Sequence, residues 1–321
     1  MRLVRAVGAS MTLEIVIAGS PGRDMSSWCA AFAAAMPQAR FHPWDDKGPY
    51  VGARYAIVWK PPAALFERET GLQAVFNLGA GIDALMDMPQ LPPHVAVLRL
   101  EDAGMAVQMV EYVLYGLLRA ARGFGRYAAQ QRQERWAPLP AVDRAAWPVG
   151  VMGLGALGTR VAQAVAALGY PVAGWARSAR ELPGVEVYAG DAQLPGFLAR
   201  SRVLVNMLPL TPQTEGILNR AHLERLRPGG YLINAARGGH LVEADLLALL
   251  HEGRMDGALL DVFHDEPLPP GHPFWQHPRV IVTPHVAAAT LLAEAVAQIT
   301  DKILAMEGGG SPAVVARDRG Y

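Results

Sequence analysis

Polar residues follow several of the apolar runs that the sequence predicts to be β-strands. Arg237 and His285 each come just after such a run. Asp261 ends another run, and Glu266 lies in the loop after it. Because ligands of open parallel sheets bind outside the carboxyl ends of the strands, we expect these side chains to gather at one sheet edge. There an arginine can pair with the carboxylate of a small acid, a histidine can transfer a proton near neutral pH, and a carboxylate can hold the imidazole in place.

A single histidine at a strand end more often makes a structural hydrogen bond. We keep that interpretation for the other eight of the nine histidines, among them His94, His222 and His251. His264, beside two acids, is expected at the surface of a loop. His285 differs because an arginine and a glutamate are expected beside it, and we predict that it acts as a general acid and base. The sequence has no H-E-x-x-H or C-x-x-C spacing, so no metal site is expected.

A glycine-rich loop connects a strand-like run to a helical run, and it reads Gly153-Leu154-Gly155-Ala156-Leu157-Gly158. In this context Gly153 permits the tight turn and Gly155 lets the backbone approach a pyrophosphate. Gly158 allows close packing of the helix on the strand, and the helix N-terminus attracts the anion. The alternative is a purely structural turn. With further strands behind the loop, we predict dinucleotide binding.

The next strand indicates which nucleotide is bound. An Asp or Glu at its end would accept hydrogen bonds from the ribose hydroxyls, but Trp175 or Ala176 occupies that place. Arg177, Ser178 and Arg180 follow, and guanidinium and hydroxyl groups suit a phosphate monoester. The alternative is an ordinary solvated loop with surface arginines. We predict a preference for NADP(H), with NAD(H) as the other candidate.

The elements that must position these residues form two series of short apolar runs alternating with helical ones, an order typical of an α/β fold with parallel strands. We expect two doubly wound parallel-sheet domains, one Rossmann-type and one flavodoxin-like, with a cleft between them. The second series predicts strands at 149–152, 172–175, 203–207, 231–234, 258–261 and 280–283. The first predicts strands at 13–18, 55–59, 74–77 and 95–98, with a helix at about 24–36 that Asp24 opens as its N-cap.

A long helical pattern over about 105–131 precedes a connection rich in proline and tryptophan at 136–148. A last helical run, about 290–306, follows the sixth strand of the second series and could cross back to the first domain. We therefore expect a discontinuous substrate-binding domain, 1–104 with 291–321, and an NADP-binding domain at 105–290.

Composition narrows the function classes. The chain has 321 residues, 29 Lys+Arg against 29 Asp+Glu, and 51% hydrophobic residues. A neutral balance argues against nucleic acid or anionic membranes as partners. The longest stretch without a charged residue, Val161–Ala176, is too short to span a bilayer. Arg5 interrupts any signal-peptide core, so we expect a cytoplasmic enzyme, with residues 1–10 as an extension of little structural role.

Several motifs, taken in order, resemble the D-isomer-specific 2-hydroxyacid dehydrogenases, and within that family the glyoxylate/hydroxypyruvate reductase A group. The resemblance covers about 11–321. Besides the glycine-rich loop, the motifs that carry it are Trp59-Lys60-Pro61-Pro62, Leu78-Gly79-Ala80-Gly81-Ile82-Asp83, Leu100-Glu101-Asp102, Leu208-Pro209-Leu210-Thr211-Pro212, Asn234-Ala235-Ala236-Arg237-Gly238, Asp261-Val262-Phe263, Glu266-Pro267-Leu268, Thr283-Pro284-His285-Val286-Ala287 and Ala316-Arg317-Asp318-Arg319-Gly320-Tyr321.

The resemblance implies roles for particular residues. Arg237, Glu266 and His285 correspond to the family's catalytic triad. On the cofactor side, Asp261 would contact the nicotinamide carboxamide, and Leu208 and Pro209 would line the cofactor site. On the substrate side, Ala80 and Gly81 would offer backbone N–H groups to the substrate carboxylate, and Trp59 would lie beside them.

Trp136 lies where related reductases send an aromatic side chain across a dimer interface into the partner's substrate pocket. The resemblance therefore implies a homodimer, while simple packing of the connection is the alternative interpretation of Trp136. His264-Asp265 departs from the family pattern before Glu266, which leaves the contacts of that loop open.

The function expected from these residues is NADPH-dependent reduction of a small 2-oxo acid, glyoxylate or hydroxypyruvate, to the 2-hydroxy acid glycolate or D-glycerate. One alternative is a dehydrogenase for a bulkier 2-oxo acid. Another is a non-catalytic nucleotide sensor with the same fold, but a sensor would need none of Arg237, Glu266 and His285.

Overall fold

The computed structural model describes residues 12–317, which divide into two compact units. The described residues of the first unit are 12–103 and 290–317, and those of the second are 104–289. These limits differ by one residue from the expected division. The expected extension at 1–10 and the final residues of the closing motif, 318–321, lie outside the described residues.

The described part of the first unit contains a parallel sheet with strand order β2-β1-β3-β4-β5. Its central strands β3 and β4 are buried along their whole length, as expected for strands covered on both faces. The bounds are β1 Leu13–Ala18, β2 Ala39–Pro43, β3 Tyr55–Val58, β4 Ala74–Asn77 and β5 Ala96–Leu98, with helices α1 Ser26–Ala35, α2 Ala64–Arg68 and α3 Asp83–Met86.

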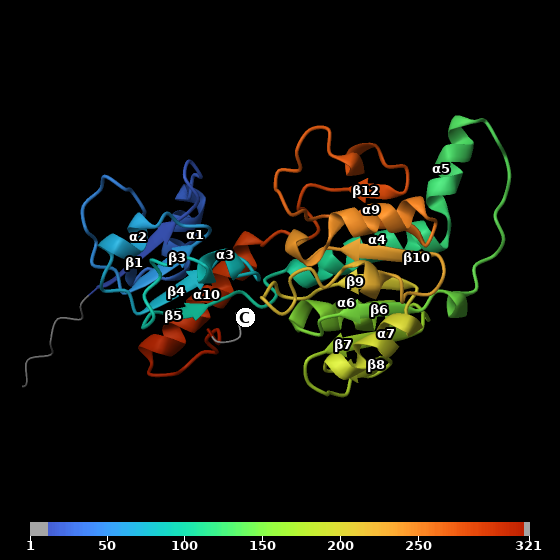
Figure 1. The fold of residues 1–321 in the computed structure, drawn as a ribbon. Helices are drawn as coiled ribbons and strands as arrows, with labels where there is room; N and C mark the ends of the chain where they lie inside the picture. The colour runs from blue at the N-terminus through green and yellow to red at the C-terminus, as the bar shows by residue number, and fades with distance from the viewer. Residues whose placement is uncertain (1–11, 318–321) are drawn as a thin grey trace, which may run out of the picture. The chain divides into compact units, whose positions relative to one another are not determined.

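Helix α10, Leu292–Glu307, returns the chain to the first unit (Figure 1). The backbone N–H of Leu291 donates to the carbonyl of Ala103 at 3.3 Å, so the two crossing segments meet before the helix begins. Ile299 and Ile303 are buried along the helix. At its end Glu307 accepts a 2.6 Å hydrogen bond from the Tyr55 hydroxyl, which fastens the helix to the sheet.

The described part of the second unit contains a parallel sheet with strand order β12-β11-β10-β9-β6-β7-β8 (Figure 1). The chain runs outward from β6 in both directions, so the carboxyl ends of β6 and β9 mark the point where ligands of such sheets bind. The bounds are β6 Val149–Met152, β7 Val172–Ala176, β8 Glu186–Ala189, β9 Val203–Asn206, β10 Gly230–Asn234, β11 Met255–Leu260 and β12 Val280–Val282.

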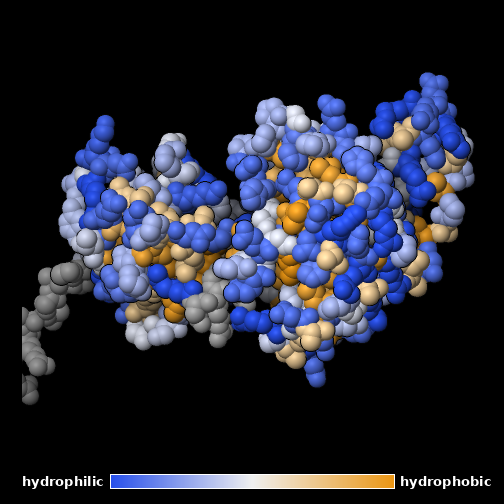
Figure 2. All heavy atoms as spheres, in the orientation of Figure 1, coloured by the Kyte–Doolittle hydropathy of each residue, from blue (hydrophilic) through white to orange (hydrophobic). Residues whose placement is uncertain are grey.

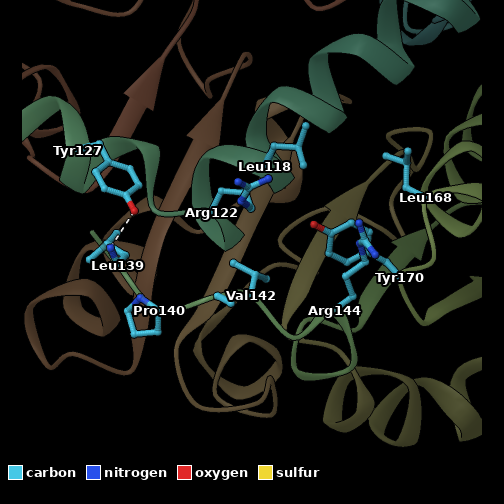
Figure 3. Close-up of a pocket in the computed structure, with 10 residues that line it drawn as sticks. Leu118, Arg122, Tyr127, Leu139, Pro140, Val142, Arg144, Leu168 and Tyr170 are labelled. Atoms are coloured by element: carbon cyan, nitrogen blue, oxygen red, sulfur yellow. Dashed lines mark hydrogen bonds between the residues drawn. The ribbon is translucent and has the colours of Figure 1, made fainter. Parts of the chain in front are cut away.

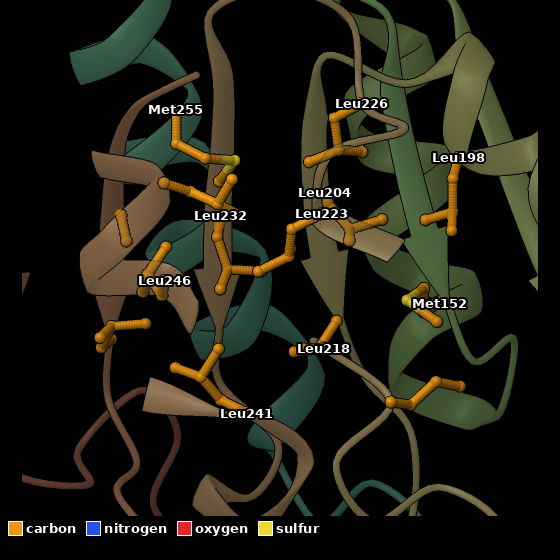
Figure 4. Packing of buried hydrophobic residues seen from close by; sticks show 14 of the residues in the cluster. Met152, Leu198, Leu204, Leu218, Leu223, Leu226, Leu232, Leu241, Leu246 and Met255 are labelled. Carbon is orange, nitrogen blue, oxygen red and sulfur yellow. The ribbon is translucent and has the colours of Figure 1, made fainter. Parts of the chain in front are cut away.

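Two hydrophobic layers cover the two faces of this sheet. One contains Leu204 and Leu232 from the strands, packed with Leu198 and Leu246 from the helices (Figure 4). The neighbouring strand residues point the other way, because side chains alternate along a strand. The helices are α4 Met105–Ala121, α5 Phe124–Arg132, α6 Ala156–Ala167, α7 Leu194–Arg200, α8 Arg220–Leu223 and α9 Glu243–His251, and the short 3-10 turns are η1 Arg144–Ala146, η2 Asp191–Gln193, η3 Gly238–His240 and η4 Pro273–Gln276.

Two sequence predictions of elements were wrong, and two strands were not predicted. The helix expected over about 105–131 is two helices, because Gly123 adopts φ +66° between α4 and α5. The first helix begins at Ser26, and Asp24 accepts a hydrogen bond from the Ser26 N–H instead of capping a helix that starts at 24. The edge strands β2 and β8 were not expected, because each mixes polar and half-exposed residues and lacks an apolar signal.

The surface shown in Figure 2 is mostly hydrophilic, with hydrophobic residues scattered among polar ones. Within residues 12–317, no helix combines the length and the apolar character needed to cross a membrane.

Candidate functional site

The glycine-rich loop between β6 and α6 is built by close backbone approaches. Gly153 has φ +94°, and a Cβ on it would lie 2.7 Å from the carbonyl oxygen of Met207. A Cβ on Gly158 would lie 1.9 Å from the carbonyl oxygen of Gly153. At Gly155, by contrast, a Cβ would meet nothing within 4 Å. The loop is therefore tight where it packs and open where a pyrophosphate would approach the N-terminus of α6.

The end of β7 carries no carboxylate that could accept hydrogen bonds from the ribose hydroxyl groups. Trp175 and Ala176 are both buried, and the indole N–H of Trp175 donates to the Gly190 carbonyl at 2.9 Å. Arg177, Ser178 and Arg180 are exposed in the following loop. Nη1 of Arg180 donates to the carbonyl of Leu154 at 2.5 Å, so one guanidinium lies against the glycine-rich loop itself.

Arg237 lies just beyond β10 and is half-buried. Its Nη1 donates to the carbonyl of the preceding residue, Ala236, at 2.7 Å. The turn that carries it packs on the loop leading to Glu266: a Cβ on Gly238 would lie 1.9 Å from the carbonyl carbon of Phe263. Glycine at 238 is thus required for the arginine turn and the glutamate loop to meet.

His285 and Glu266 form a hydrogen-bonded pair at the same edge. Nδ1 of His285 lies 2.8 Å from Oε2 of Glu266, and the other carboxylate oxygen, Oε1, accepts the Phe263 N–H at 3.1 Å. Because a carboxylate only accepts, the proton sits on Nδ1, and Nε2 is the nitrogen that can exchange a proton with a substrate. The two side chains are 47% and 34% exposed, so the pair is accessible.

The backbone at His285 adopts φ +56°, which residues other than glycine rarely do. Asp261, only 1% exposed, holds this conformation. Its carboxylate accepts hydrogen bonds from Thr283 Oγ1 at 2.6 Å, Val286 N at 2.9 Å and Ala287 N at 2.8 Å. The segment is therefore anchored on both sides of His285, a role for Asp261 that the sequence did not indicate. The expected contact of Asp261 with a nicotinamide stays a prediction.

Tyr112, from α4, is another residue that the sequence analysis missed. Its hydroxyl lies 2.7 Å from Thr283 Oγ1, which itself bonds Asp261. Burial raises the pKa of Tyr112 above its usual range, so it stays a neutral hydrogen-bonding group. A helical Tyr in an apolar run gives no sequence signal for such a contact.

Leu208 and Pro209 follow β9, and beneath them lie three polar side chains that are 0% exposed: Asn206, Asn234 and His240. The Leu208 N–H donates to Oδ1 of Asn206 at 3.2 Å, and Pro209 offers its carbonyl to Nε2 of His240 at 3.1 Å. The sequence analysis treated His240 only as one of the structural histidines. The available sequence signal for this cluster was that an asparagine ends each of two neighbouring strands, Asn206 at the end of β9 and Asn234 at the end of β10.

Three further predicted residues, Trp59, Ala80 and Gly81, lie in the first unit. The Trp59 ring packs on the backbone of Gly79, where a Cβ would come within 2.4 Å of the ring. Asn77 donates through Nδ2 to the carbonyls of Gly79 and Gly81 at 3.1 and 2.8 Å, which fixes the loop that contains Ala80. These residues are therefore brought together with one another beyond β3 and β4.

Trp136 is 98% exposed, in the segment after α5. The structure describes every residue of α5, and none of them is buried. Figure 1 shows this helix standing apart from the sheet of its unit. A cavity of about 390 Å³ opens between α4 and the following segment, where the Leu139 N–H donates to the Tyr127 hydroxyl at 2.8 Å (Figure 3). Its lining residues include none of the predicted site residues.

Among the described residues, no group of three or more His, Cys, Asp or Glu side chains could hold a metal ion. The candidate chemistry of the second unit thus rests on Arg237, the His285–Glu266 pair and the glycine-rich loop.

Comparisons with known proteins show to which family this chain is similar. Residues 114–287 match the model of the D-isomer specific 2-hydroxyacid dehydrogenase, NAD binding domain. The chain is 45% identical over 303 residues to glyoxylate/hydroxypyruvate reductase A from Serratia proteamaculans, covering 92% of this chain and 96% of that protein.

Two solved structures are also similar. One is a D-isomer specific 2-hydroxyacid dehydrogenase from Xanthobacter autotrophicus Py2 in complex with NADPH and MES, with a TM-score of 0.92, 40% identity, and coverage of 97% of this chain and 100% of that one. The other is an NADPH-dependent glyoxylate/hydroxypyruvate reductase from Sinorhizobium meliloti in complex with NADP and sulfate, with a TM-score of 0.90, 37% identity, and coverage of 96% and 100%. The expected α/β class with two parallel-sheet units is confirmed.

Proposed function

This chain belongs to the D-isomer specific 2-hydroxyacid dehydrogenases, and we propose that it reduces glyoxylate or hydroxypyruvate to glycolate or D-glycerate with NADPH. The observation that carries the proposal is the hydrogen-bonded His285–Glu266 pair at the sheet edge that also holds Arg237. The names of the relatives support this substrate class.

The residues at this edge of the sheet have different roles in the proposed reaction. Arg237 neutralises the substrate carboxylate and polarises the carbonyl group. His285, protonated and held through Nδ1 by Glu266, gives the Nε2 proton to the carbonyl oxygen as the carbonyl carbon is reduced. When bound, NADPH supplies the hydride for that carbon.

The second unit fits such a cofactor. Gly155 leaves open space at the N-terminus of α6 for a pyrophosphate. Beyond β7, Arg177, Ser178 and Arg180 would hold the 2′-phosphate, and the absence of an acid there removes a group that would repel it. The solved relatives bound to NADPH or NADP support this preference, with NAD(H) as a weaker alternative.

The first unit would contribute to substrate binding. Ala80 and Gly81 lie in a loop that Asn77 fixes, which suits backbone N–H groups that bind a carboxylate. Trp59 packs on the same loop and would limit the size of the substrate. A small 2-oxo acid fits this assignment better than a bulky one.

We further propose that the enzyme acts as a homodimer in the cytoplasm. A helix without buried residues, α5, and the 98% exposed Trp136 are what a subunit interface would cover. Trp136 would then enter the substrate pocket of the partner. The balanced charge of the chain fits a small-molecule enzyme without nucleic acid or membrane partners.

The test is to follow NADPH absorbance with glyoxylate, hydroxypyruvate, pyruvate and phenylpyruvate, and to repeat the panel with NADH. We expect glyoxylate and hydroxypyruvate to give the highest kcat/KM, and NADPH to be preferred. Highest activity with phenylpyruvate would replace the proposal by a dehydrogenase for bulky 2-oxo acids. Tight NADPH binding without turnover of any acid would indicate a nucleotide sensor instead.

A further inference from the structure

A buried histidine lies beneath the loop that carries Arg237, and the proposed reaction does not use it. His240 ends the short turn η3, and its side chain is 0% exposed. Its Nε2 lies 3.1 Å from the carbonyl oxygen of Pro209. Its Nδ1 lies 2.9 Å from Nδ2 of Asn206 and 3.1 Å from the carbonyl oxygen of Arg237. The ring therefore contacts the ends of two different strands.

The neighbours of the ring fix its protonation state. Oδ1 of Asn206 must face the Leu208 N–H, because only the oxygen can accept that bond. The amide nitrogen of Asn206 therefore faces His240 and donates to Nδ1. The ring proton then sits on Nε2 and is donated to Pro209, while Nδ1 is occupied as an acceptor for Asn206 and makes no hydrogen bond to the nearby carbonyl of Arg237.

Asn234 completes the connection. Its Oδ1 accepts from Nδ2 of Asn206 at 3.0 Å, and its Nδ2 donates to the carbonyl of Arg237 at 3.1 Å. Asn206 thus donates both of its amide protons within this cluster, one to Asn234 and one to His240. The backbone of Arg237 and the loop after β9 are linked through three side chains that water does not reach.

We propose that His240 is a positioning residue that ties the Leu208–Pro209 segment to the backbone of Arg237. Strands β9 and β10 pair only as far as Asn206 and Asn234, so ladder hydrogen bonds cannot fix the loops beyond them. The imidazole fills this gap: Nε2 donates to Pro209, and Nδ1 accepts from Asn206, which is connected to the Arg237 carbonyl through Asn234. The proposal rests on the proposed function, in which the first loop serves the cofactor and Arg237 serves the substrate.

Two substitutions test the roles of the two ring nitrogens of His240 separately. In His240→Asn, an amide oxygen near the place of Nδ1 can still accept from Asn206, while the hydrogen bond to Pro209 is lost. In His240→Gln, an amide nitrogen near the place of Nε2 can still donate to Pro209, while the acceptor for Asn206 is lost. His240→Asn therefore breaks the direct bond to Pro209, whereas His240→Gln breaks the path through Asn206 and Asn234 to the carbonyl of Arg237.

We expect His240→Asn to raise the Kd for NADPH about 3- to 10-fold with a smaller change in the KM for glyoxylate. His240→Gln should do the reverse, with a lower kcat/KM for glyoxylate and a nearly unchanged Kd for NADPH. The Kd is measured by quenching of tryptophan fluorescence, and the KM at saturating NADPH. Ser201→Ala is the matched control, because it removes a buried hydrogen bond at the opposite end of β9.

The inference is overturned if each variant changes the Kd for NADPH and the kinetic constants for glyoxylate to the same extent. It is also overturned if neither variant differs from Ser201→Ala. Unfolding temperatures are measured for all variants, and a loss of stability shared with the control cannot produce opposite changes in the two constants. A wild-type enzyme that turns over none of the 2-oxo acids would instead refute the proposed function. In that case the Kd for NADPH of His240→Asn still tests the connection to Pro209.

Discussion

The segment around His285 and the segment around Trp136 both present an exposed side chain, but they differ in what holds that side chain. Behind His285 lies Asp261, a buried carboxylate that accepts hydrogen bonds from both sides of the histidine. Near Trp136 lies α5, which buries none of its residues. The hydrogen bonds that hold the first segment lie within one chain, whereas the second segment is the one that the proposed dimer would cover. Substitutions in the two segments should therefore differ in size and in kind.

The largest effect is expected at His285. His285→Ala removes the proton donor, and kcat should fall about 10²- to 10⁴-fold while NADPH still binds. The measurement is steady-state turnover of glyoxylate together with NADPH binding by fluorescence. His251→Ala, at the exposed end of α9, is the control and should keep wild-type turnover. Unchanged turnover in His285→Ala would refute the assignment of the general acid.

A smaller loss is expected for Asp261→Asn. The amide is similar in size, but it loses the charge that strengthens the hydrogen bonds to the His285 segment, so kcat should fall about 10- to 100-fold. Asp256→Asn is the matched control, because Asp256 is an exposed acid on β11, the strand that Asp261 follows. Equal activities of the two variants would show that the buried carboxylate does not support the histidine.

The loop after β7 offers a similar contrast between two arginines, Arg177 and Arg180. Arg177→Ala should raise the KM for NADPH about tenfold and leave the KM for NADH nearly unchanged, because only NADPH carries the 2′-phosphate. Arg180→Ala should raise both values, since Arg180 also bonds the carbonyl of Leu154 in the glycine-rich loop. Equal effects of Arg177→Ala on the two cofactors would remove the argument for NADP(H).

The smallest effect is expected at Trp136. If its ring enters the partner's pocket, Trp136→Ala should raise the KM for glyoxylate about threefold without changing kcat. Sedimentation velocity should show a dimer for both the wild type and the variant, because α5 remains to form the interface. A monomeric wild type with the same KM as the variant would contradict the role of Trp136.

The two segments also differ in how far the sequence predicted them. His285 and Glu266 follow apolar runs of a parallel sheet, so the sheet rule placed them at one edge, and the structure joins them at 2.8 Å. The support of Asp261 for the loop could not be predicted, because it depends on the φ of +56° at His285. Nor did the sequence separate His240 from a structural histidine, since its importance comes from contacts with loops far away in the chain.

The edge strands β2 and β8 and the break between α4 and α5 were not predicted, for a related reason. Strand β8 pairs on one side only and is half-exposed, so its residues carry little apolar periodicity. The break at Gly123 depends on a left-handed backbone and on contact with Leu139, which belongs to the following segment. Local patterns predict elements that are buried on both faces, and these elements are not.

The return of α10 to the first unit has a consequence for the order in which the protein is made. The sheet of the first unit is synthesised first, but Ile299 and Ile303 of its covering helix emerge from the ribosome only after all seven described strands of the second unit. At about 5–20 residues per second, the roughly 200 intervening residues take of the order of 10–40 s to synthesise. During that time one face of the first sheet is without α10, so the nascent chain exposes apolar surface that a chaperone can recognise.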